Sequence, residues 1–236
     1  GACVARWLRG GRDQMRDRAM RRAWLFAFSI LAGSIAPCQD TFIVQFDSVQ
    51  AGHDASGRSV METDSGLIVF AWQHSDDGTG RMRSAVYELA ADGTFVSRYE
   101  IGSGDSTTSG FGNFDPVERL VDGGFISTIT NHQGYSYAIA LARFNANGDL
   151  IGSTPVISSP PEDSTYIFSR QLRRTSDGGF VFCGFVDPPD DLAKASLVKV
   201  DSAGLVEWQQ VFTASGQLYE AISVAPYVDG GYVLAG

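Results

Sequence analysis

The chain has 236 residues, of which 44% are hydrophobic, so it is long enough for one large domain with a sizeable core. Its 27 glycines, 15 phenylalanines and 8 tyrosines favour many short strands joined by tight turns over a helical bundle, which predicts an all-β protein. Residues 1–22 hold seven arginines against two aspartates, a net charge of +5, so with a total of −9 the remaining residues carry −14. That acidic remainder would repel phosphate backbones and anionic surfaces, and we expect no nucleic acid and no membrane surface as a partner.

The first predicted element is an export signal. Met20 and two arginines precede an apolar run over 23–36, and a polar break follows Cys38. The run is shorter than the roughly 20 apolar residues that span a bilayer, so we expect it to be cleaved and not retained. The expected segments are an upstream read-through 1–19 and a signal peptide 20–38, together the leader 1–38, and then an incomplete β-propeller repeat domain over 39–236.

This leader predicts export to the extracellular space, the periplasm or the cell surface, with no membrane insertion after cleavage. The stretch 35–38 distantly resembles a bacterial lipoprotein box, but Pro37 stands where that box requires a small residue. Cys183 is the one cysteine beyond the leader, so no disulfide framework is predicted. It lies in an apolar run, and we expect a buried small hydrophobe and not a nucleophile.

One turn motif recurs through the mature domain and predicts four hairpins. It reads Asp-Ser-Gly-Leu or Asp-Gly-Gly-aromatic, at 64–67, 122–125, 177–180 and 229–232, and the spacings between the aligned glycines are 58, 55 and 52. Glycine supplies the positive φ angles that tight hairpin turns demand, which we expect at Gly124 and Gly179. An apolar run after each turn predicts a strand. Phe125, Phe180 and Tyr232, which begin three of those strands, should face the same way.

A second turn motif recurs between these, at 91–93, 146–148 and 202–204, with spacings of 55 and 56. Alternating apolar segments precede and follow each of these turns and predict two further strands per unit. The preceding segments are 84–89, 137–144 and 195–200, and the following ones are 94–101, 149–157 and 205–212. Each unit is therefore predicted as strand, DGG-type turn, strand, variable loop, strand, NG-type turn, strand.

Four antiparallel strands every 52 to 58 residues are typical of a β-propeller blade, whereas a β-sandwich, the alternative, would not need the same turns at a fixed period. We expect about three four-stranded antiparallel blades plus part of a fourth, because the sequence stops within a predicted strand. The segment 41–46 lies before the first DGG-type turn as an extra strand. In the intact ring it should pair with the final blade and leave no open sheet edge.

The segments 176–180 and 196–204, followed by Trp208, resemble the "SDGGY…LVKLDSNG…W" repeats of secreted bacterial propeller proteins. The stretch 140–150 is similar to the "ALARYNPDGSLD" of bacterial delta-60-type repeats. The resemblance covers about residues 41–236 and implies the propeller fold. It implies little about activity, because the matching residues form turns and core.

Several residues suggest chemistry but fit no complete motif. Trp208 follows a turn one residue short of the quinoprotein docking motif, and we interpret it as packing between blades. The segment 175–182 fits only the first half of the aspartate box of sialidase-type propellers, and no arginine cluster, tyrosine or carboxylate spacing completes such a site. No catalytic residue, no cofactor-binding residue and no cofactor is predicted.

A metal site is left open. His74, His132 and Asp187 each stand eight residues beyond an aligned glycine, on loops that would share one face of a propeller. Neighbouring blades would hold these positions too far apart for the roughly 2 Å bonds of one zinc ion, so solvated loop polarity is the favoured interpretation. The acidic loops 75–78 and 187–191 lack the calcium-loop spacing and are interpreted as turns.

The function expected from the sequence is a non-enzymatic extracellular or cell-surface propeller that presents loops for protein or glycan binding. The alternative is a secreted, glycan-active hydrolase or lyase whose catalytic blades lie beyond this sequence, and a third possibility is a structural repeat without a ligand. An enzyme should place carboxylates, arginine or histidine on the innermost strands of several blades.

Overall fold

The structure is a computed structural model that describes residues 55–74, 81–101, 108–133, 136–159, 165–213 and 220–236, all within the unit 44–236. Every regular element of these residues is a strand, which confirms the all-β expectation. Among them no helix is long and apolar enough to cross a membrane. The predicted leader 1–38 and the predicted closing strand 41–46 lie outside the described residues.

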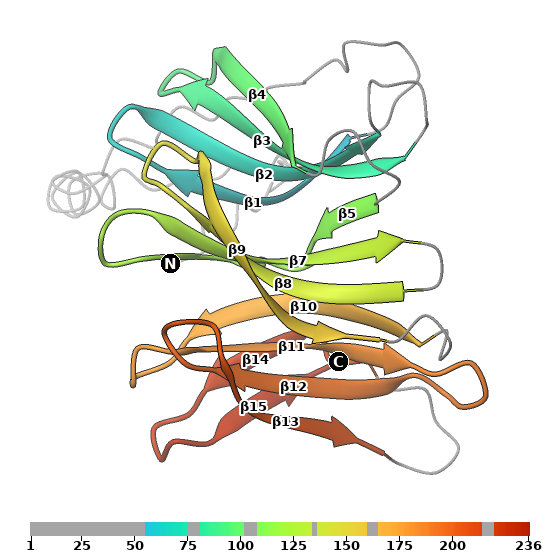
Figure 1. The fold of residues 1–236 in the computed structure, drawn as a ribbon. Coiled ribbons are helices and arrows are strands. Elements are labelled where there is room, and N and C mark those ends of the chain that lie inside the picture. The colour runs from blue at the N-terminus through green and yellow to red at the C-terminus, as the bar shows by residue number, and fades with distance from the viewer. Residues whose placement is uncertain (1–54, 75–80, 102–107, 134–135, 160–164, 214–219) are drawn as a thin grey trace, which may run out of the picture. The chain divides into compact units, whose positions relative to one another are not determined.

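The strands form four antiparallel sheets in chain order (Figure 1). The first sheet holds β1 (Ala55–Glu62), β2 (Gly66–His74), β3 (Met82–Ala90) and β4 (Phe95–Ile101). The second holds β5 (Thr108–Phe111), β6 (Val117–Arg119), β7 (Phe125–Gln133), β8 (Ser136–Phe144) and β9 (Leu150–Ser158). The third holds β10 (Tyr166–Arg174), β11 (Phe180–Asp187), β12 (Lys194–Val200) and β13 (Val206–Phe212), and the fourth holds β14 (Ser223–Pro226) and β15 (Tyr232–Ala235).

The predicted order of strands and turns is found in the first and third sheets. The second sheet differs, because its first strand is split into β5 and β6, which both pair with β7. Residues 112–116 leave the ladder between them, and this segment contains Gly112 and Pro116. Proline has no N–H to donate, and glycine weakens a strand interior, so the break falls where the sequence supports a ladder least.

Six of the described turns share one hydrogen-bond pattern. In each turn, the N–H of residue i donates to the carbonyl of residue i+4. The N–H of the fourth residue, i+3, donates to the carbonyl of residue i. The first residues of the six turns are Ala90, Leu120, Asn145, Thr175, Asp201 and Tyr227. The fourth residue is a glycine with φ between 84° and 90° in all six. A left-handed glycine of this kind closes a three-residue hairpin loop with a bulge. The turn that begins at Thr63 is shorter and lacks this pattern.

The expected left-handed φ at Gly124 and Gly179 is wrong, because Gly123 and Gly178 adopt it instead. The second glycine is needed for another reason. A Cβ at Gly124 would collide with the carbonyl oxygen of Phe144, the last residue of β8. The same collision would occur between Gly179 and the carbonyl oxygen at the end of β12. The first glycine thus sets the turn, and the second lets two strands approach closely.

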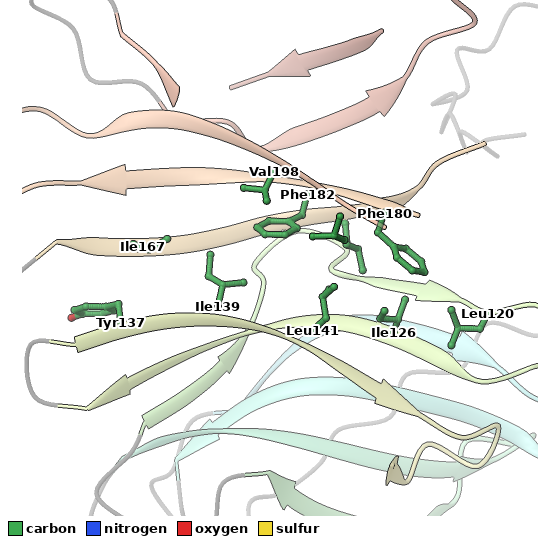
Figure 2. Packing of buried hydrophobic residues seen from close by; sticks show 11 residues of the cluster. Leu120, Ile126, Tyr137, Ile139, Leu141, Ile167, Phe180, Phe182 and Val198 are labelled. Atoms are coloured by element: carbon green, nitrogen blue, oxygen red, sulfur yellow. The ribbon is translucent and has the colours of Figure 1, made fainter. Parts of the chain in front are cut away.

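Apolar layers lie between consecutive sheets. Between the first and second sheets the ring of Phe70 contacts those of Phe111, Phe125 and Phe144, with centroids 5.2 to 5.9 Å apart. Figure 2 shows the layer between the second and third sheets, which contains Leu120, Ile126, Tyr137, Ile139, Leu141, Ile167, Leu172, Phe180, Phe182, Val198 and Val200. A smaller layer with Cys183 joins the third sheet to the fourth.

The first aromatic residue after each DGG turn points toward the preceding sheet. Phe125 belongs to the layer between the first and second sheets, and Phe180 belongs to the next layer. Tyr232 packs against the layer between the third and fourth sheets. The expectation that these three side chains face the same way is confirmed.

The NG-type turns also pack on the preceding sheet. A Cβ on Gly148, between β8 and β9, would lie 2.9 Å from Ile68 of the first sheet. A Cβ on Gly204, between β12 and β13, would lie 3.4 Å from Leu141 of the second sheet. The turn glycines therefore fit both the local φ and the surface of a neighbouring sheet.

Candidate ligand-binding site

The first strands of the first and third sheets carry a β-bulge at the same place. The register shifts between Gly57 and Ser59 in β1, and between Ser169 and Gln171 in β10. The extra residue is an arginine in both strands, Arg58 and Arg170, five positions before the turn. Five positions before the equivalent turn of the second sheet is Asp115, within the segment that leaves the ladder. Bulges re-aim side chains, so the same offset places charged groups along three strands.

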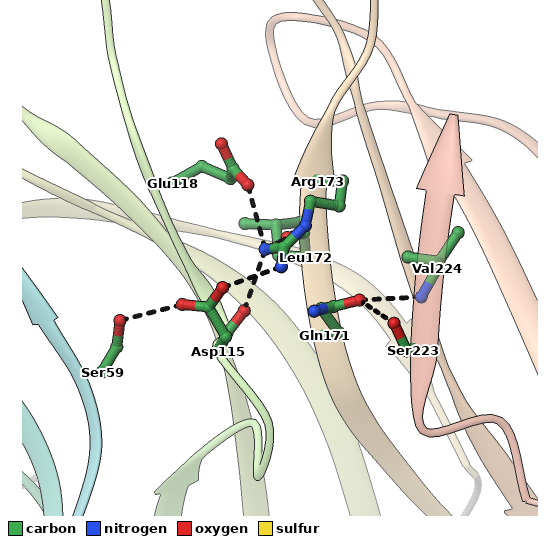
Figure 3. A network of polar contacts seen from close by, with 8 residues as sticks. All are labelled: Ser59, Asp115, Glu118, Gln171, Leu172, Arg173, Ser223 and Val224. Carbon is green, nitrogen blue, oxygen red and sulfur yellow. Dashed lines mark hydrogen bonds and ion pairs between the residues drawn. The ribbon is translucent and has the colours of Figure 1, made fainter. Parts of the chain in front are cut away.

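A polar network joins the first strands of all four sheets (Figure 3). Asp115 accepts a hydrogen bond from the Ser59 hydroxyl at 3.1 Å and pairs with Arg173 at 2.8 Å. Arg173 also pairs with Glu118 at 3.1 Å. Burial raises the pKa of Glu118, and the Arg173 charge opposes that rise. Asp115 has φ of 50°, the one positive value of a non-glycine residue in the described ranges.

The third and fourth sheets are joined through Gln171 of β10. Its Oε1 accepts hydrogen bonds from the Ser223 hydroxyl and from the Val224 N–H, both at 2.8 Å (Figure 3). A buried acceptor that receives two donors costs little to bury, so this contact fixes β14 beside β10.

The two bulge arginines lie on aromatic rings. The Arg58 guanidinium carbon is 4.2 Å from the centre of the Trp72 ring. The Arg170 guanidinium lies 5.1 Å from the centre of the Phe185 ring and forms an ion pair with Glu220. The Nε atoms of both arginines are buried without a hydrogen-bond partner. Burial, and secondarily the charge of Arg170, lower the pKa of Arg58.

A pocket of about 200 Å³ opens where β2, β3, β5, β7, β8 and β10 come together. It is lined by Trp72, Met82, Ser109, Gly110, Thr130, His132, Tyr137 and Phe168. We call it the aromatic pocket, because four of these eight side chains carry aromatic rings. A mostly apolar cavity with a few polar groups is the usual character of a small-molecule site.

Ring contacts hold the aromatic pocket in shape. Tyr137 stacks on His132, with centroids 4.3 Å apart and planes at 14°, and lies 5.7 Å from Phe168. The indole N–H of Trp72 donates to the Phe111 carbonyl at 2.7 Å, which fixes the orientation of the ring. Burial, and then the neighbouring Tyr166, raise the pKa of Tyr137 to about 12, so its hydroxyl keeps its proton at neutral pH. The pocket is therefore largely formed before any ligand enters.

A larger hollow of about 570 Å³ lies between the third and fourth sheets. Its lining includes Leu197, Phe212, Tyr232 and Leu234, and Glu220 is its single charged residue. Glu220 already pairs with Arg170. We therefore place the candidate site at the aromatic pocket, where rings, hydroxyl groups and a histidine converge.

The residues predicted to be structural have that role in part. Cys183 is fully buried, and burial raises the pKa of its thiol to about 11, so the expectation of a buried small hydrophobe is confirmed. Trp208 on β13 is 38% exposed, with its ring 5.6 Å from Tyr232 of the fourth sheet. It joins two sheets as expected, but at their rim and not in the core.

The half aspartate box forms an internal contact. Asp177 accepts hydrogen bonds from the Thr175 hydroxyl at 2.5 Å and from the Gly179 N–H at 3.0 Å, and it pairs with Lys199 at 2.9 Å. These partners hold the pKa of Asp177 well below its usual range, the Thr175 bond first. Lys199 also pairs with Glu207 of β13 at 2.9 Å. The motif thus fastens a turn to the neighbouring strands.

Of the three residues of the open metal prediction, the structure describes the side chains of His132 and Asp187. His132 lines the aromatic pocket, and Asp187 ends β11 opposite Tyr166. The backbone of His74 ends β2 opposite Met82, and its side chain lies outside the described part. Over the described ranges no group of three or more His, Cys, Asp or Glu side chains could hold a metal ion.

The two acidic loops have different outcomes. In the loop 187–191, Asp191 accepts a hydrogen bond from the Leu192 N–H at 2.8 Å and pairs with Lys194, so it forms a local turn as expected. The loop 75–78 lies outside the described residues.

The sequence did not predict Arg58, Arg170 or most of the aromatic pocket. A usable signal existed, because both arginines lie five residues before a turn. Comparison with known proteins adds no family: no family model matches the chain, and no curated protein is significantly similar to it. The resemblance to secreted propeller repeats therefore stays a prediction.

Proposed function

We propose that this chain is part of an exported, non-enzymatic β-propeller, extracellular or on a cell surface, that binds a glycan in the aromatic pocket. Four observations support the propeller: four-stranded antiparallel sheets, their order along the chain, apolar layers between consecutive sheets, and polar contacts between their first strands. In a ring of such blades the first strands would line the centre.

The aromatic pocket is the observation that carries the glycan assignment. The apolar C–H faces of a sugar ring pack on aromatic rings, here Trp72, Tyr137 and Phe168, while sugar hydroxyls need hydrogen-bond partners such as Thr130 and His132. A volume of about 200 Å³ is below the roughly 300–1,000 Å³ of drug-sized sites, so the pocket suits a single sugar ring of a longer glycan.

A glycan array probed with the 236-residue chain, followed by calorimetry on the hits, tests this function. Met82→Trp should fill the pocket and weaken binding at least tenfold, because Met82 lines it at the start of β3. Trp208→Phe on β13 is the matched control and should leave binding unchanged. If no glycan on the array binds, and if the chain instead captures a protein that the Met82→Trp variant no longer captures, the ligand of the pocket is a protein and not a glycan.

The alternative, a glycan-active hydrolase or lyase, is favoured by one observation. The first strands and the residues beside them carry Arg58, Asp115, Glu118, Arg170 and Glu220. The carboxylates among them are engaged in ion pairs with arginines, which suits cross-linking better than proton transfer. Release of reducing ends or unsaturated sugars from array hits would favour the enzyme, provided that Glu118→Gln abolishes it while the variant stays folded.

A further inference from the structure

Arg58 and Arg170 lie against the same short segment of the second sheet, residues 110–115. Arg58 rests on Trp72, whose indole bonds to the Phe111 carbonyl, and a Cβ on Gly110 would lie 2.8 Å from the Trp72 ring. On the third-sheet side, the carbonyl of Arg170 accepts the N–H of Phe114 at 3.0 Å. Ser59 and Arg173, close to the two arginines in sequence, both bind Asp115. Arg58 therefore adjoins this segment through Trp72, and the Arg170 guanidinium lies 5.6 Å from the centre of the Phe114 ring.

The two bulge arginines differ in how their charge is neutralised. Arg170 pairs with Glu220, while Arg58 has no carboxylate partner among the described residues and lies on Trp72. The neighbouring Asp115 and Glu118 already pair with Arg173, so the group is neutral overall but offers Arg58 no ion pair. The charge of Arg170 also contributes to the lowered pKa of Arg58, after burial, so the two cations lie within electrostatic range of each other. A bound anion would relieve that repulsion.

We propose that Arg58 and Arg170 bind the carboxylate of an acidic sugar whose ring occupies the adjoining aromatic pocket. This inference rests on the proposed glycan-binding function and names the class of glycan. Trp72 connects the two parts, because it lines the pocket and carries Arg58 on its ring. The planar fork of arginine matches a carboxylate with two parallel hydrogen bonds.

The test compares two probes that differ only in the carboxylate: a uronic-acid oligosaccharide and its carboxyl-reduced counterpart. Calorimetry with the 236-residue chain should give at least tenfold tighter binding of the acidic probe, as expected for hydrogen bonds to a charged group. Added salt should weaken binding of the acidic probe and leave binding of the reduced probe nearly unchanged.

Arginine variants locate the effect. Arg58→Gln should remove most of the preference for the acidic probe over the reduced probe, and Arg58→Lys should restore part of it. Arg174→Gln removes an exposed cation from the same strand as Arg170 and should keep the full preference. Thermal melting verifies that each variant is folded. If Arg58→Gln fails to fold, the ratio of the affinities of Arg58→Lys for the acidic and the reduced probe is used in its place.

The outcomes separate the two proposals. Equal affinity for both probes, weakened by Met82→Trp, would overturn the carboxylate site and leave glycan binding standing. The carboxylate site would also be overturned if the folded Arg58→Gln variant kept its preference for the acidic probe. If that variant does not fold, an undiminished preference in Arg58→Lys would overturn the site instead. Absence of binding to either probe and to every array glycan would reject the carboxylate site together with the proposed function.

Discussion

The two edge strands of the third sheet, β10 and β13, have opposite surroundings. β10 buries Ile167 and Leu172 between sheets and exchanges polar contacts with the second and fourth sheets through Arg173 and Gln171. β13 is mostly exposed. Its Trp208 ring contacts Tyr232 of the fourth sheet at the rim, and the ion pair between Glu207 and Lys199 lies within the third sheet. Both strands complete the same ladder, so the hydrogen-bonded backbone does not decide which edge carries function. The bulge residue of β10, Arg170, lies beside the neighbouring sheets, whereas the register shift of β13 falls at the exposed Glu207.

The largest effect should come from the buried side of β10. Leu172→Ala removes a fully buried side chain from the layer between the second and third sheets, and we expect a loss of about 2–5 kcal/mol in unfolding free energy. Urea denaturation followed by fluorescence measures it. A loss below 1 kcal/mol would mean that β10 is not part of the core.

The turn after β10 offers a test of two adjacent glycines. Gly179→Ala forces a Cβ onto the Val200 carbonyl, and we expect a loss of about 2 kcal/mol or more. Gly178→Ala meets no atom within 4 Å and suffers only from φ of +87°, so about 1 kcal/mol is expected. The reverse order in urea midpoints would contradict the assignment of the two roles.

The polar contacts of β10 should contribute less than its apolar ones. Arg173→Met leaves Asp115 and the partly buried Glu118 without a counter-charge, and we expect a loss of about 2 kcal/mol, between the values typical of exposed and buried pairs. The control Lys194→Met breaks a pair within one loop of the third sheet and should cost under about 0.5 kcal/mol. Equal losses would show that contacts between sheets carry no extra weight.

The turn after β10 should also respond to acid. Partners in the folded state keep the pKa of Asp177 below its ordinary value of 3.8, so its contribution is present above that pH and is lost as the pH falls below it. Asp177→Asn should therefore be less stable than wild type at pH 7, and the difference should shrink toward pH 3. Urea midpoints at pH 7, 4 and 3 measure this trend, and a constant difference would contradict it.

The smallest effect belongs to β13. Val206→Thr changes a side chain that is 43% exposed and keeps the β-branched shape that suits a strand, so we expect a change within about 0.5 kcal/mol. A loss as large as that of Leu172→Ala would remove the contrast between the two edges.

The sequence was sufficient for features that depend on local backbone chemistry. The turns that begin at Leu120, Thr175 and Asp201 were predictable because glycine and aspartate mark them, and the alternating strands around them followed. The φ assignment was one residue off, because the shorter turn at Thr63 was aligned with the longer ones through its single glycine. The single glycine of the shorter turn matches the second glycine of the longer turns, and the positive φ of the longer turns belongs to their first glycine.

The candidate site was not predictable to the same degree. Trp72, Tyr137 and Phe168 come from three sheets, and no spacing in the sequence shows that they meet. The bulges at Arg58 and Arg170 depend on how each strand pairs with its neighbour. The residues of a single strand do not show which of its positions is bulged. His132 was singled out by its register, but its stacking on Tyr137 follows from strand pairing that the turns alone do not specify.

The contacts of Gly148 and Gly204 with the preceding sheets have a consequence for how the chain acquires its structure. The NG-type turns of the second and third sheets each pack on a surface made earlier in the chain, at Ile68 for one and Leu141 for the other. A chain that becomes available from its N-terminus can therefore complete one sheet and use it as the template for the next. Such vectorial assembly keeps most pairing local and limits the time that each apolar face spends exposed to aggregation.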